Sequence, residues 1–126
     1  MTDREILELA AKAAGFDVSH FDRDKRAMVV FAIDGDENPD QEYWNPLTDD
    51  GDALRLAVKL GICVTPYPIF ANPKHSVIAK LYQSRLNLDR GLSTAIEIIE
   101  LYNNDPYAAT RRAIVRAAAE IGKAMK

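Results

Sequence analysis

The sequence predicts an α+β domain in which three helices flank a largely antiparallel sheet. Three segments carry apolar residues at helical spacing between capping residues, and the segments between them are rich in β-branched and aromatic residues. The predicted order is helix, two strands, helix, two or three strands, helix, which is typical of an α+β fold. With 126 residues, 48% of them hydrophobic, the chain is long enough for one domain, spanning residues 1–126, with a core that needs no disulfide or structural metal.

The first helix is predicted over residues 3–14. Thr2 and Glu5 have the spacing of a capping box at its start, and a glycine follows its last residue. Two antiparallel strands, 16–21 and 27–33, come next, because β-branched and aromatic residues flank a charged segment that suits a hairpin loop.

The second helix is predicted over residues 50–60. Thr48 or Asp49 can cap its free N–H groups, and Gly61 ends it. Its broad apolar face includes Leu54, which we expect to pack on the sheet.

Strands are predicted again in the second half of the chain. Residues 62–70 form a strand pattern interrupted by prolines, which places this strand at a sheet edge or at a bend. Residues 76–86 are predicted as a further strand. Residues 93–102 fit a buried strand and a short helix almost equally, and we favour the strand.

The last helix is predicted over residues 106–121, with Asp105 as its cap and a proline at its first position. Ile114 belongs to its apolar stripe and should be buried. Arg112 and Arg116 lie off this stripe on a basic side of the helix, which makes both candidate binding residues.

The net charge of −3 is unevenly distributed, since residues 1–63 carry −7 and residues 64–126 carry +4. Residues 34–52 hold eight acidic side chains and no basic one, whereas the end of the chain is basic. Such a distribution can steer a charged partner or drive association between copies, although a solvated loop and a solvated helix face are the simpler explanation. Because the net charge is negative and the sequence has no nucleic-acid-binding motif, we do not expect a protein dedicated to binding DNA or RNA.

Metal and cofactor sites are not predicted. Residues 34–38 alternate oxygen-bearing side chains as a calcium loop does, but Pro39 and Asn45 stand where such a loop needs glycine and glutamate. The chain also lacks a glycine-rich phosphate loop and a dinucleotide-binding fingerprint, so no cofactor is expected.

No catalytic group stands out among the nucleophilic and basic residues. Cys63, the single cysteine, lies between two aliphatic residues of a predicted strand and is expected to be a small buried hydrophobe. His20 and Asp22 would form a base and its orienting group if the strand geometry allowed, but no nucleophile motif accompanies them. A cleft joining these three residues would indicate an enzyme.

Trp44, the only tryptophan, is the third candidate binding residue. It follows Tyr43 in a short predicted strand, 42–44, and directly precedes the second helix. The two adjacent aromatic rings can stack a base or anchor a partner, whereas the structural alternative is a hydrophobic staple that fixes how the chain enters the helix.

Three blocks of sequence resemble a known group of proteins. TDREILELA (2–10), WNPLTDDGDALRLA (44–57) and DPYAATRRAIVRAA (105–118) are similar to small proteins of tailed bacteriophages and prophages, the group called the phage ABA sandwich domain. The resemblance implies a phage accessory protein with helices flanking a sheet, and it brings no catalytic or ligand residues.

These observations together favour a non-enzymatic interaction protein that acts in the cytoplasm of an infected host. Its expected partner is a host protein or a second copy of the chain. No apolar run reaches the roughly 20 residues that span a bilayer, so no membrane association is expected. The alternative is a small enzyme, or a module that binds nucleotides or nucleic acid, with a pocket that the sequence does not reveal.

Overall fold

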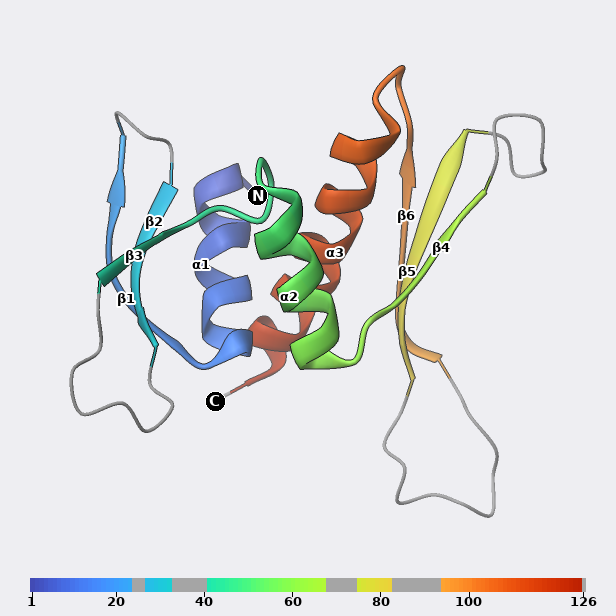
Figure 1. The fold of residues 1–126 in the computed structure, drawn as a ribbon. Helices are drawn as coiled ribbons and strands as arrows, with labels where there is room; N and C mark the ends of the chain where they lie inside the picture. Colours follow the sequence, from blue (N-terminus) through green and yellow to red (C-terminus); the bar gives the residue numbers. More distant parts are fainter. Residues whose placement is uncertain (24–26, 33–40, 68–74, 83–93, 126) are drawn as a thin grey trace, which may run out of the picture.

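The computed structural model describes residues 1–23, 27–32, 41–67, 75–82 and 94–125 (Figure 1). The helices are α1 (Asp3–Ala14), α2 (Asp50–Leu60) and α3 (Pro106–Ala124). The strands are β1 (Phe16–Asp22), β2 (Ala27–Ala32), β3 (Gln41–Trp44), β4 (Cys63–Pro66), β5 (Ser76–Tyr82) and β6 (Thr94–Leu101). The chain therefore runs through two α-β-β-β units and ends in α3, which confirms the predicted α+β class. The order of the elements matches the prediction roughly, since three strands rather than two precede α2.

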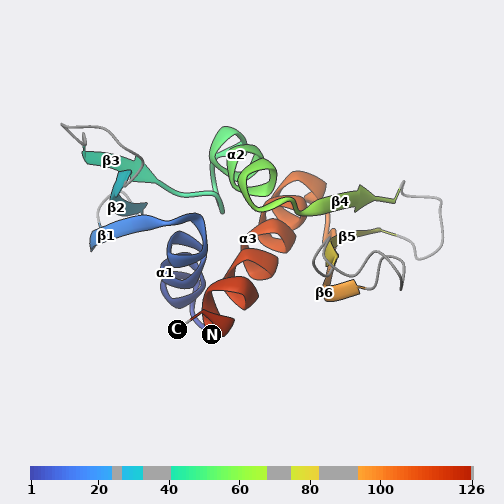
Figure 2. The ribbon, with the colours of Figure 1, turned by 90° about the horizontal axis from the view of Figure 1, so that it is seen from below.

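The helices form a middle layer between two antiparallel sheets (Figures 1 and 2). Sheet A has the order β1-β2-β3 and packs on α1, and sheet B has the order β4-β5-β6 and packs on α3. All three helices run in the same direction (Figure 1). We predicted a single sheet between helices, and the structure has two because α2 carries the chain across the helical layer before β4 begins.

Helix α3 is the centre of the fold, because it contacts α1, α2 and sheet B. Its buried residues occur on most of its sides, and the majority are alanines: Ala109, Ala113, Ala117, Ala118 and Ala119. Such small side chains let the neighbouring elements approach closely. Ile114 is buried at 5% exposure, as predicted.

The helix caps form as the sequence predicts. Thr2 and Glu5 make both hydrogen bonds of the capping box. Asp49, rather than Thr48, caps α2 and accepts a hydrogen bond from the Asp52 N–H group at 2.8 Å. Asp105 caps α3 by accepting one from the Ala108 N–H group at 3.0 Å. Helix α3 continues three residues past its predicted end at residue 121.

The ambiguous segment 93–102 contains strand β6, which confirms the interpretation that we favoured. Ile96 and Ile98 pack against the core, while Ile99 and Leu101 point to the exposed face, which is the alternation of a strand covered on one side. Strand β4 is an edge strand among the described residues, as its prolines predict. Parts of four predicted strands, residues 33, 68–70, 83–86 and 93, lie outside the described residues.

Candidate protein-interaction surface

Helix α2 presents two large aliphatic side chains to solvent. Leu54 is 64% exposed and Val58, one helical turn later, is 74% exposed. The prediction that Leu54 packs on the sheet was wrong. Ala53, Leu56 and Ala57 already fill the side of α2 that faces the core, and Leu54 lies about 100° around the helix from Ala53.

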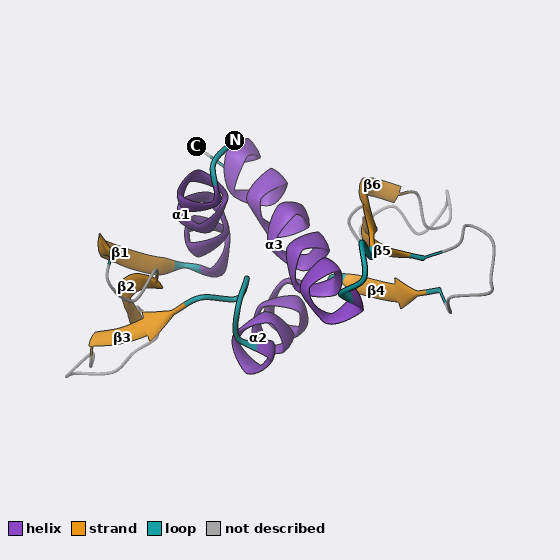
Figure 3. Ribbon diagram, turned by 90° about the horizontal axis from the view of Figure 1, so that it is seen from above, coloured by secondary structure: helices purple, strands orange, loops and turns teal. Residues whose placement is uncertain are grey.

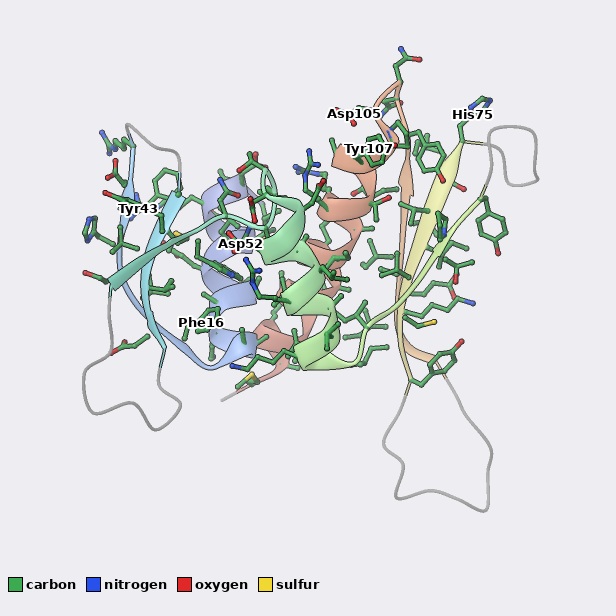
Figure 4. The ribbon with its side chains drawn as sticks, in the orientation of Figure 1. Phe16, Tyr43, Asp52, His75, Asp105 and Tyr107 are labelled. Carbon is green, nitrogen blue, oxygen red and sulfur yellow. The ribbon has the colours of Figure 1, made fainter. Side chains whose placement is uncertain are left out.

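A groove between α2 and α3 continues this apolar surface. Its volume is about 260 Å³, and its apolar lining comes from α2, α3 and β4: Ala53, Leu54, Ala57, Val64, Tyr107 and Ile114. Tyr107, near the N-terminal end of α3 (Figure 4), is 72% exposed. We call Leu54, Val58, Tyr107 and this groove the α2–α3 patch.

Arg111 holds the two sides of the groove together. Its Nε donates a hydrogen bond to the Leu47 carbonyl at 2.8 Å, and its Nη1 lies 2.6 Å from Asp50 Oδ1. The Arg111 side chain is only 17% exposed, so a largely buried arginine side chain links the N-terminal end of α2 to α3. Asp50 belongs to the acidic segment 34–52 and Arg111 to the basic end of the chain, so the two segments meet in space here.

The candidate binding residues Arg112 and Arg116 both have carboxylate partners within the chain. Arg112 Nη1 lies 3.0 Å from Asp3 Oδ1, and Arg116 Nη1 lies 2.5 Å from Glu100 Oε1. The Glu100 carboxylate also lies 3.8 Å from Arg112 Nε. These contacts join α3 to α1 and to β6, and they neutralise much of the positive charge on this side of α3.

Trp44, the other candidate binding residue, is buried at the end of β3. Its ring meets Phe16 edge to face, with 5.4 Å between the ring centroids. Both rings line a cleft of about 440 Å³ between sheet A and α2, to which α2 contributes Asp52, Arg55 and Lys59. Figure 4 labels Phe16 and Asp52 in this region.

Two of the charged groups at this cleft are held by neighbours. The Asp52 carboxylate accepts hydrogen bonds from the Asn45 N–H group at 3.0 Å and from Arg55 Nη2 at 2.8 Å. The Lys59 ammonium lies 4.9 Å from the centre of the Phe16 ring. The cleft therefore combines an aromatic wall with cations on the opposing helix.

His20 and Cys63 are not brought together. His20 lies on β1 in sheet A and Cys63 on β4 in sheet B, on opposite sides of the helical layer (Figure 1). Cys63 is exposed, so the prediction of a buried thiol was wrong. The cleft that would have joined His20, Asp22 and Cys63 is therefore not formed.

The described part of the chain has no group of three side chains that could hold a metal ion, and none of its helices is long and apolar enough to cross a membrane. The acidic segment 34–40 lies outside the described residues.

Comparison with known proteins identifies no relative of this chain. No protein-family model, curated protein or solved structure matches the chain. The resemblance to the phage ABA sandwich group stays a prediction.

The α2–α3 patch was missed at the sequence level, although the sequence carries a signal for it. Apolar residues occupy positions 53, 54, 56, 57, 58 and 60 of α2 and wrap around more of the helix than the stripe of about 100° that one core contact requires. A helix with so wide an apolar surface either packs on two sides or leaves part of that surface exposed.

Proposed function

We propose that this protein is a non-enzymatic interaction protein that binds another protein through the α2–α3 patch. The observation that carries the proposal is the exposure of Leu54, Val58 and Tyr107 beside an apolar groove. Single exposed apolar residues are common on soluble proteins, but a contiguous patch bordered by polar groups is typical of an interaction site. A tyrosine in such a patch supplies a large contact area and a hydroxyl group for hydrogen bonding.

The patch is built on rigid elements, which supports a binding role. Arg111 fixes α2 to α3, and Ala53, Ala57 and Ile114 form the buried side of the groove. A surface that is already ordered loses little conformational entropy when a partner binds.

The resemblance to phage proteins suggests where the partner is found. We propose that the protein is a phage accessory protein acting in the host cytoplasm, and that host proteins are the first candidates to test. This part of the proposal rests on the three sequence blocks at 2–10, 44–57 and 105–118.

The test compares binding by patch and control variants. Partners are first captured from host lysate and identified by mass spectrometry, and each is then purified and its dissociation constant measured by calorimetry. Tyr107→Asp should weaken binding of the true partner at least about tenfold, as expected for a central interface aromatic.

The matched control is Tyr43→Asp. Tyr43 is 53% exposed on β3, away from the patch, so its replacement should leave the dissociation constant unchanged. Equal affinities for wild type, Tyr107→Asp and Tyr43→Asp would contradict the proposal.

The cleft beside Trp44 favours a second candidate function, the binding of a nucleotide. Phe16 and Trp44 offer an aromatic wall for a base, and Lys59 offers a cation for a phosphate, whereas Arg55 is already paired with Asp52. Trp44 is the only tryptophan, so its fluorescence reports directly on this cleft. Titration with ATP and with GTP should give a saturable change that Lys59→Ala weakens, and an unchanged spectrum would contradict this function.

A further inference from the structure

We draw no further inference here: the strongest candidate, the exposed apolar face of α2 that carries Leu54 and Val58 on one side of the helical layer (Figure 3), belongs to the α2–α3 patch already described, and nothing in the described part of the chain shows which molecule covers it.

Discussion

Gly122 of α3 packs against the backbone carbonyl of Leu9 in α1, so closely that a β-carbon at residue 122 would overlap the carbonyl oxygen. A backbone group within a helix cannot rotate away as a flexible side chain can. We expect Gly122→Ala to cost up to about 2 kcal/mol net, because overpacking of about 1–3 kcal/mol is offset by a gain of only about 1 kcal/mol in helix propensity. Chemical denaturation measures this change.

Gly51→Ala is the matched control for this prediction. A β-carbon at Gly51 in α2 would lie 3.2 Å from the Arg55 guanidinium nitrogens and from the capping oxygen of Asp49, and these side-chain atoms need to shift by only a few tenths of an ångström. Because the gain of about 1 kcal/mol in helix propensity opposes this small cost, the free energy of unfolding should not fall by more than about 0.5 kcal/mol. Equal losses for the two substitutions would contradict the close packing of α1 on α3.

A second prediction separates the buried and exposed aliphatic residues at the α2–α3 groove. Ile114→Ala should lower the free energy of unfolding by about 2–5 kcal/mol, since Ile114 is 5% exposed. Leu54→Ala should change it by no more than about 0.5 kcal/mol, because Leu54 is 64% exposed. Chemical denaturation of both variants measures these changes. A large fall in the free energy of unfolding for Leu54→Ala would show that the Leu54 side chain is covered in solution.

The helix boundaries were predictable because their causes are local. A capping side chain and the N–H group it binds are only three residues apart at Thr2, Asp49 and Asp105, so both stand in the same short stretch of sequence. The same holds for the hairpin of β1 and β2, whose strands flank one charged loop. Local chemistry therefore specifies most of the secondary structure.

The division into two sheets was not predictable from such signals. Side chains of β4 and β5 point alternately to the two faces of their sheet, and antiparallel pairing of these two strands keeps that alternation. The alternation is the same whether the pair forms a separate sheet or joins sheet A, so it does not distinguish the two. Whether the strands form one sheet or two depends on where α2 places the start of β4. That position follows from packing between segments that are distant in sequence. The Arg111 contact with Leu47, across 64 residues, is of the same kind.

The candidate site was only partly predictable for the same reason. The apolar width of α2 is visible in the sequence, but which part of it remains exposed depends on how α3 packs beside it. Arg112 and Arg116 were recognised as lying off the apolar stripe, yet their partners Asp3 and Glu100 come from other elements. Periodicity shows which side of a helix is polar, and it does not show what that side contacts.

Cys63 provides a third prediction. It lies in edge strand β4, where alternate side chains point to opposite faces, so Val64 packs toward the core and Cys63 is exposed. We expect a thiol reagent such as DTNB to modify one thiol per folded chain without denaturant. Labelling that occurs only after unfolding would contradict the exposed position.

A fourth prediction concerns the acidic residues 34–40, which lie outside the described part of the structure. The sequence there lacks the glycine and glutamate that complete a calcium loop, so neither Ca²⁺ nor Mg²⁺ should be needed for folding. Excess EDTA should leave the melting temperature unchanged. A fall of several degrees that one of these cations reverses would reveal a metal site in this segment.

The last prediction concerns the ion pair between Arg116 of α3 and Glu100 of β6. From the sequence, reversing the charge at Arg112 and Arg116 should leave the fold intact, because both residues lie off the apolar stripe. The structure shows that the reversal at Arg116 carries a cost in stability. The Glu100 side chain is only 17% exposed and lies 2.5 Å from Arg116 Nη1, so a glutamate at residue 116 would face a poorly solvated carboxylate.

We expect Arg116→Glu to lower the free energy of unfolding by about 1–2 kcal/mol, more than the loss of an exposed ion pair, which costs up to about 1 kcal/mol. Adding Glu100→Arg should recover part of this loss by restoring opposite charges, and the double-mutant cycle isolates that coupling from the effects of each substitution. Lys123→Glu, an exposed charge reversal on the same basic side of α3, is the control and should change stability little. If Arg116→Glu unfolds at the wild-type denaturant concentration, or if Glu100→Arg adds a further loss, the ion pair does not stabilise the packing of β6 on α3.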